Sequence, residues 1–331
     1  MAGVAVRGKA GLLKDGDRVL DRRRFLVGLA AGAAGLLVSK GKLQAFPVPK
    51  SLKLGATDKS EKSEIHTMAV VKGANPELAT RKAIELIGGM GSFVSKGDVV
   101  LVKPNIGWDR VPEQAANTNP VVVGTLVALA LEAGAKKVVV ADNPCNDARR
   151  TYVRSGIADA AKNAGAEVVY MEDRHYVKTN LNGEVIKDWL VYRGAIEADK
   201  IINVPIAKHH GLGGLTLAMK NLMGVTGGAR NLMHQRLPES LVDLGAFFKP
   251  RLTVLDAVRI LKANGPQGGS TQDVVELNTV AASADPVHIE AFGVTLFGKK
   301  VEDFPTVALA EKRGLGTGDF RSTGFIEVNL G

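Results

Sequence analysis

Two adjacent histidines, a glycine-rich turn and a lysine stand close together in the chain. The turn follows His210, and Lys220 comes ten residues after that histidine. Backbone N–H groups of a glycine turn that opens a helix can bind an anion, and a lysine amine adds a point charge. We therefore predict that Gly213, Gly214 and Lys220 contact a phosphate or a carboxylate. The competing interpretation is a plain turn followed by a solvated lysine.

Imidazoles can act as acids or bases, or can bind a metal ion. His209 and His210 are neighbours in the sequence, and neighbouring side chains seldom point at one ion. We predict the acid/base role, or a metal-ligand role, for His210, and a ligand contact for His209. Arg230 follows closely and is predicted to close over the bound anion. His234 lies four residues further on, and a lone histidine is as often structural as functional.

Short apolar runs alternate with helical segments from residue 65 onward, and this alternation predicts an α/β fold. Continuous apolar strands between helices favour a mostly parallel sheet with helices on both faces, either as one body or as two lobes with a cleft between them. Residues 181–184 contain Asn-Gly between extended flanks, which is typical of a hairpin. The predicted helices begin at Pro76, Pro120 and Ile157. The predicted strands cover residues 68–71, 99–102, 137–141, 167–171, 200–204, 252–255 and 279–282.

Polar residues follow five of these strands, and ligands of parallel α/β sheets bind outside the carboxyl ends of the strands. We therefore expect one shared cleft at that edge. Asp285 precedes Pro286 and a helix, which also favours helix capping. The residues predicted to contact a ligand are Lys103, Asn105, Asn119, Lys208, His209, Gly213, Gly214, Lys220, Asn221 and Arg230. The weak candidates for metal binding are His210, Asp142 and Asp256.

The composition removes several classes of protein. Of 331 residues, 45% are hydrophobic and 23% are charged, which is ordinary for a globular chain. A single cysteine, Cys145, excludes a disulfide framework and an iron–sulfur cluster held by this chain alone. Most of the +9 net charge lies in residues 1–45, so no nucleic-acid surface is expected on the folded part. No HExxH, GxSxG, CxxC or EF-hand motif occurs.

The N-terminal segment has the pattern of an export signal. Paired arginines precede Phe25 and Leu26, and an apolar run rich in Ala and Gly extends to Val38. This run is shorter than the roughly 20 residues that a membrane span needs. It resembles a twin-arginine signal, which implies a periplasmic or extracytoplasmic location. We predict a signal peptide over residues 1–45, a linker over 46–64 and the folded domain over 65–331; an uncleaved membrane anchor is the alternative.

The segments from about residue 68 to residue 320 resemble the domain-of-unknown-function family 362. Its motifs match here in consistent order, including Val100 to Asn105, Ile202 to Pro205, Lys208-His209-His210 and Met219-Lys220-Asn221. Many members carry a ferredoxin-like module with two four-cysteine motifs, but the single cysteine of this chain does not fit that iron–sulfur description. The family is also distantly similar to the nickel-pincer lactate racemases, in which a histidine precedes a cofactor-holding lysine by about ten residues.

That second resemblance implies that His210 and Lys220 hold a metal-containing cofactor. The racemases' other catalytic histidine is replaced by asparagine in Asn117-Thr118-Asn119-Pro120, which argues against two-base racemisation. The sequence thus predicts an exported protein that binds a small anionic molecule or a metal-containing cofactor. The alternative is a non-catalytic partner of a periplasmic iron–sulfur or redox system. The membrane is expected to be contacted through the leader alone.

Overall fold

The computed structural model describes residues 66–331. The predicted signal peptide and linker lie outside this range. The described residues all belong to one compact unit, so the two-lobe alternative does not apply to them. Within this range, no helix has the length and apolar character that crossing a bilayer requires.

A ten-stranded, mostly parallel sheet organises the protein, in the order β12-β1-β11-β10-β7-β2-β3-β4, with β8 paired to β10 and β9 to β8. The neighbours from β10 through β7, β2 and β3 to β4 run parallel. The strands of this sheet are β1 (Met68–Lys72), β2 (Val99–Pro104), β3 (Lys137–Asp142), β4 (Glu167–Tyr170), β7 (Lys200–Val204), β8 (Ile206–His210), β9 (Gly214–Thr216), β10 (Leu252–Leu261), β11 (Val274–Ser283) and β12 (Phe325–Asn329). A separate antiparallel pair consists of β5 (Tyr176–Asn180) and β6 (Asp188–Tyr192).

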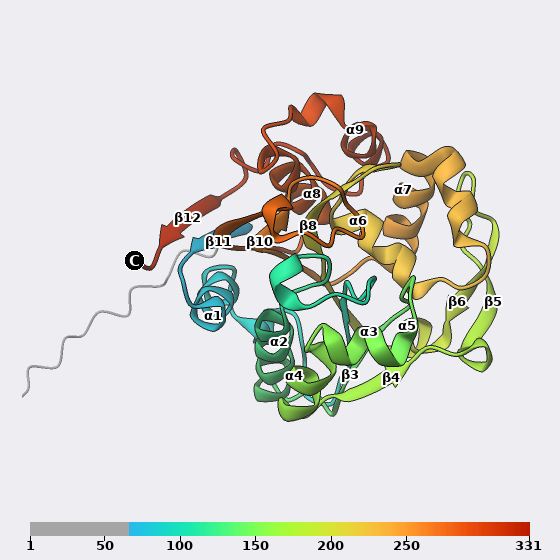
Figure 1. The fold of residues 1–331 in the computed structure, drawn as a ribbon, viewed down its shortest axis with the longest axis horizontal. Coiled ribbons are helices and arrows are strands. Elements are labelled where there is room, and N and C mark those ends of the chain that lie inside the picture. The colour runs from blue at the N-terminus through green and yellow to red at the C-terminus, as the bar shows by residue number, and fades with distance from the viewer. Residues whose placement is uncertain (1–65) are drawn as a thin grey trace, which may run out of the picture. The chain divides into compact units, whose positions relative to one another are not determined.

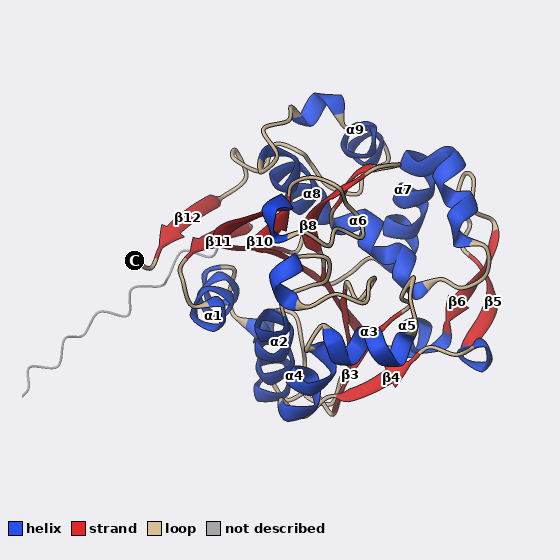
Figure 2. Cartoon of the chain, in the orientation of Figure 1, coloured by secondary structure: helices blue, strands red, loops and turns tan. Residues whose placement is uncertain are grey.

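Helices cover both faces of this sheet (Figures 1 and 2). Alternate residues of each buried strand enter different cores: Leu101 packs in one, and its neighbours Val100 and Val102 pack in the other. Helices α1, α2 and α4 pack on one face, and α6 to α9 pack on the other. The α-helices are α1 (Pro76–Leu86), α2 (Pro120–Glu132), α3 (Ala148–Arg154), α4 (Ile157–Asn163), α5 (Arg193–Glu197), α6 (Ala218–Asn221), α7 (Leu237–Phe248), α8 (Pro286–Thr295) and α9 (Pro305–Lys312).

Three helices begin where a capping side chain meets a proline. The side chains of Asn75, Asn119 and Asp285 accept hydrogen bonds from the first backbone amides of α1, α2 and α8. The following proline lacks an N–H group that the first helical turn would leave unpaired in any case. These sequence signals therefore mark the helix starts correctly.

The structure confirms the α/β class and contains each of the seven predicted strands, but two of them differ from the expectation in ways that matter for the site. The strand predicted over 252–255 continues to Leu261, so Asp256 lies inside β10 rather than at its end. The strand predicted over 279–282 is part of β11, which runs antiparallel to β10. Asp285, after β11, therefore lies at the opposite edge of the sheet from the carboxyl ends of β2 and β3.

Candidate functional site

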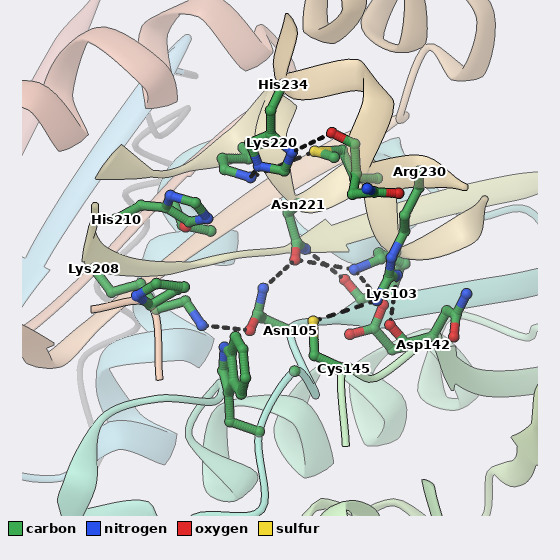
Figure 3. Close-up of a pocket in the computed structure, with 18 residues that line it drawn as sticks. Lys103, Asn105, Asp142, Cys145, Lys208, His210, Lys220, Asn221, Arg230 and His234 are labelled. Carbon is green, nitrogen blue, oxygen red and sulfur yellow. Dashed lines mark hydrogen bonds and ion pairs between the residues drawn. The ribbon is translucent and has the colours of Figure 1, made fainter. Parts of the chain in front are cut away.

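A cleft of about 180 Å³ opens at the carboxyl ends of β2, β3 and β8 (Figure 3). By volume it has room for several water molecules or one small ligand. Residues far apart in the sequence meet here because the parallel strands β2 and β3 end side by side, while the β8–β9 hairpin and α6 complete the wall. The structure places eight of the predicted residues in its lining: Lys103, Asn105, Asp142, Lys208, His210, Lys220, Asn221 and Arg230.

A buried ion pair forms one part of the lining. The Nζ atom of Lys103, at the end of β2, lies 2.7 Å from Oδ1 of Asp142, at the end of β3. Both side chains are almost completely buried. Burial lowers the pKa of Lys103, while the carboxylate of Asp142 opposes this effect. A Cβ atom at Gly224 would overlap both charged groups, so glycine at this position lets the backbone pass over the pair.

Asn221 of α6 connects this pair to the rest of the cleft. Its Oδ1 atom accepts hydrogen bonds from Lys103 Nζ (3.0 Å) and Asn105 Nδ2 (3.1 Å), and its Nδ2 group donates to Asn203 (2.8 Å). Asn203 in turn donates to the Ala218 carbonyl at the start of α6. This chain of amides fixes α6, and thereby Lys220, against the ends of the strands.

Lys208 is 1% exposed and has no carboxylate partner within the described residues. Its Nζ atom donates to the Ala116 carbonyl (2.6 Å) and to Asn105 Oδ1 (3.0 Å). Burial, together with the charges of Lys220 and Lys103, lowers its pKa to about 7. Successive residues of a β-strand point to opposite faces, so Lys208 and His210, two positions apart in β8, both point into the cleft. For the same reason His209 points away, where its Nδ1 atom accepts the amide of Gly265 (3.1 Å).

A lysine–histidine contact lies next to the stacked histidines. Nζ of Lys220 is 3.1 Å from Nε2 of His234, and the rings of His210 and His234 stack with centroids 5.5 Å apart. Burial is the largest cause that lowers the pKa of Lys220 to about 8 and that of His210 to about 3. His210 is therefore a neutral imidazole in the physiological range, which makes it a hydrogen-bonding group, and its acid/base role stays a prediction.

Arg230 spans the mouth of the cleft. Its guanidinium donates to the carbonyls of Asn143 (2.6 Å) and Pro144 (3.2 Å) and contacts Sγ of Cys145 at 3.4 Å. None of these contacts is with a carboxylate, so no Asp or Glu of residues 66–331 compensates the positive charge. Thr216 also lines the cleft, and its buried hydroxyl has no hydrogen-bond partner among the described residues.

Five predicted residues lie outside the cleft lining, and each has a structural role. Asn119 caps α2 and donates its backbone amide to Asp256, whose carboxylate also accepts the amide of Val258. The turn of Gly213 and Gly214 joins the antiparallel strands β8 and β9 rather than opening a helix, and the Gly213 amide donates to Nδ1 of His210 (3.0 Å). The fifth, His209, faces the other side of β8. The glycine turn was expected to open a helix and to bind an anion through its backbone amides. Since α6 begins only at Ala218, the turn does not open a helix.

The residues of the cleft do not form a metal site of their own. Within residues 66–331 no group of three or more His, Cys, Asp and Glu side chains could hold a metal ion. Asp142 is paired with Lys103, and Asp256 is occupied by two backbone amides away from the cleft. The predicted set of His210, Asp142 and Asp256 therefore does not fit a metal held by side chains alone.

Several residues of the cleft were missed by reasoning from the sequence. Trp108, Met223 and Thr216 have no residue type or spacing that points to a site, and only the fold brings them to the lining. His234 was considered as a lone histidine. Its position four residues after Arg230, in the 3-10 segment Arg230–Arg236, was the available signal that both could face one site.

A model of one protein family matches residues 100–295 of the chain, and its description is "Domain of unknown function (DUF362)". The chain belongs to the DUF362 family. A curated relative is the thylakoid-associated protein of Synechocystis sp., which is 30% identical over 244 residues covering 71% of this chain and 74% of that protein. The matched segment contains the cleft residues from Lys103 to His234.

Two solved structures are similar to this DUF362 chain. One is the lactate racemase apoprotein of Thermoanaerobacterium thermosaccharolyticum, with 11% identity, a TM-score of 0.41, and coverage of 69% of this chain and 56% of that one. The other is a protein of Thermotoga maritima, with 11% identity, a TM-score of 0.38, and coverage of 73% and 60%. The chain thus spans less than two thirds of the length of either structure.

Proposed function

We propose that this DUF362 protein binds a small anionic ligand, carrying a carboxylate or a phosphate, in the cleft. The observation that carries the proposal is the charge balance of the lining. Lys208, Lys220 and Arg230 have no Asp or Glu ion-pair partner within residues 66–331, whereas Lys103 in the same cleft is paired at 2.7 Å. Lys208 and Lys220 are buried, and buried cations without counter-ions are unfavourable, so an anionic ligand would supply the missing charge.

The hydrogen-bonding groups of the cleft suit the same kind of ligand. The neutral ring of His210 accepts the Gly213 amide at Nδ1, so its proton is on Nε2, which is a donor. The hydroxyl of Thr216 has no partner and can donate as well. Oxygen atoms of a carboxylate or a phosphate accept from lysine, arginine, hydroxyl and imidazole donors alike.

Isothermal titration calorimetry of the protein with inorganic phosphate and with glycolate, at constant ionic strength, tests the proposal. We expect saturable binding of at least one of the two anions, and a loss of affinity on the order of tenfold or more in Lys208→Met, since one charge-assisted hydrogen bond contributes about 1.5–3 kcal/mol. Lys312→Met, which removes an exposed lysine of α9, is the matched control. Absence of binding to both anions, or equal losses in the two variants, would contradict the proposal.

We further propose that the chain is exported through a twin-arginine signal. The support is the sequence Arg23-Arg24-Phe25-Leu26 before a weakly apolar run, in a segment outside the described residues. The relative from Synechocystis is named for its association with thylakoids. Cell fractionation of the full chain tests this: the double variant Arg23→Lys, Arg24→Lys is expected to stay in the cytoplasm, whereas Lys40→Arg is exported normally. The mass of the exported chain distinguishes a cleaved signal from an uncleaved anchor.

A further inference from the structure

The three lysines of the cleft differ in what their amines contact. Lys103 donates to the Pro104 carbonyl and to Asn221 Oδ1, and it pairs with Asp142. Lys208 donates to the Ala116 carbonyl and to Asn105 Oδ1. Both amines are thus held by oxygen acceptors, which stabilise an ammonium group.

Lys220 has no oxygen acceptor among the described residues. Its Nζ atom contacts Nε2 of His234 at 3.1 Å and the thioether of Met223 at 3.5 Å. Thioether sulfur is a weak acceptor. The side chain is 7% exposed, and it lines the cleft. Of the three amines, Lys220 is therefore the one that is held by no oxygen atom of the described residues and that has an imidazole nitrogen beside it.

The hydrogen bonds of His234 define its tautomer, and thereby whether the nitrogen next to Lys220 carries a proton or a lone pair. Nδ1 lies 3.1 Å from the Asn231 carbonyl, and a carbonyl only accepts, so Nδ1 carries the proton. In the neutral ring Nε2 is then an acceptor, directed at the amine of Lys220. A base next to a desolvated amine is the arrangement that activates a lysine as a nucleophile.

We propose that the amine of Lys220 forms an imine with a small carbonyl compound that also carries an anionic group, such as a 2-oxo acid. This inference rests on the proposed anion binding and names the class of ligand. Arg230 and Lys208, both in the lining of the same cleft, would bind the anionic group and bring the carbonyl carbon to Lys220. The pKa of Lys220, lowered to about 8 mainly by burial, leaves a fraction of the amine neutral near pH 7.

The reaction needs no oxidant or reductant. The Lys220 ammonium gives a proton to His234 Nε2, and the free amine attacks the carbonyl carbon, so that a C–N bond forms and the carbonyl oxygen becomes a hydroxyl group. The proton returns from His234 to this hydroxyl, which leaves as water as the C=N bond forms. The sum is ammonium plus carbonyl giving iminium plus water. His210, with its proton on Nε2, can donate to the developing oxygen.

Reductive trapping tests the proposal on the full folded protein. The protein is incubated with glyoxylate and sodium cyanoborohydride, and the modified residue is found by peptide mass mapping. We expect one carboxymethyl group, on Lys220, ahead of every other lysine. Inorganic phosphate should slow the modification, and acetaldehyde, which lacks the anionic group, should not select Lys220. Lys220→Arg and Lys220→Gln should both lose the label at this site.

His234 is the acid/base residue in this proposal, and His234→Gln tests that role. We expect the rate of trapping at Lys220 to fall on the order of 10²-fold, as for loss of an acid/base group, with its pH profile moved toward higher pH. Labelling spread over exposed lysines, or selected at Lys103 or Lys208, would overturn the imine proposal. If calorimetry still shows phosphate binding in that case, the anion site stands and only the carbonyl chemistry is lost.

Discussion

Lysines in one cleft occur in two opposite electrostatic situations. Lys103 is completely buried and is paired with Asp142, and both groups are also held by hydrogen bonds. Lys208, Lys220 and Arg230 have only neutral contacts within the described part of the chain. The first arrangement is complete in the absence of a ligand, whereas the second leaves charge for something to neutralise. The difference separates residues that build the cleft from residues that bind a ligand in it, although all four basic residues line the same cleft.

The largest effect is expected from breaking the compensated pair. Asp142→Ala removes the only carboxylate in the described cleft lining and the acceptor of the Ile106 amide, so the buried Lys103 is left uncompensated. Removing one partner of a buried ion pair costs about 3–5 kcal/mol of stability. Urea denaturation at pH 7 is expected to show a loss of this size.

The double variant Lys103→Met, Asp142→Asn is the control for this prediction. It removes both charges, and we expect it to recover much of the lost stability. Equal stability of the wild type and Asp142→Ala would show that the pair does not determine the structure of the cleft. Gly224→Ala should resemble Asp142→Ala, because its Cβ atom would overlap both charged groups.

The uncompensated cations predict the next effect, a dependence of stability on pH. The pKa of Lys208 falls from its ordinary value of 10.5 to about 7 in the folded protein. Between these values the unfolded chain binds a proton that the folded chain does not, so stability should rise with pH, by up to about 1.4 kcal/mol per pH unit from this group. Denaturation of wild type and Lys208→Met between pH 7 and pH 9.5, without added anions, measures the difference.

We expect Lys208→Met to be at least as stable as the wild type at pH 7 and to have the smaller pH slope. A slope that the substitution leaves unchanged would place the titrating group elsewhere. Burial lowers the pKa of Lys103 as well, although its carboxylate partner opposes the effect, so any contribution from Lys103 has the same sign. The difference in slope between the wild type and Lys208→Met therefore measures the part of the pH dependence that belongs to Lys208.

Anion affinity should also change with pH, in the reverse direction. Glycolate keeps its charge above neutral pH, while Lys208 and Lys220, with pKa values of about 7 and 8, lose theirs. We expect the affinity measured by calorimetry to fall on the order of tenfold between pH 7 and pH 9. The pKa of His210, lowered to about 3, means that its protonation should not contribute in this range. Affinity that stays constant or rises over this interval would contradict the assignment of these lysines.

The sequence was sufficient to predict β2 and β3, two of the three strands that end at the cleft, and the four Lys and Arg residues of its lining. Apolar runs ending in polar residues identify β2, β3 and β7, and parallel strands bring their ends to one edge. It did not reveal that β11 runs antiparallel, or that the Gly213–Gly214 turn joins two strands, because both depend on pairing between distant segments. Charge compensation also depends on the tertiary structure, because Lys103 and Asp142 are 39 positions apart in the sequence. Nothing in the residues around Lys103 and around Lys208 shows that only the first lysine has a carboxylate partner.

The smallest expected effect comes from Asn119, which the sequence places at a helix start and also predicts, like Asn105, as a ligand contact. Asn119 caps α2 through the Val121 amide, whereas Asn105 contacts both Lys208 and Asn221 in the cleft. Asn119→Ala should cost about 1 kcal/mol of stability, as for a lost helix cap, and leave glycolate affinity unchanged. Asn105→Ala should weaken glycolate binding, because Lys208 loses the acceptor that orients its amine. Denaturation and calorimetry of both variants measure this contrast. A loss of affinity in Asn119→Ala would mean that the start of α2 belongs to the ligand site. Asn119 would then count among the residues that bind the ligand and not among those that only support the fold.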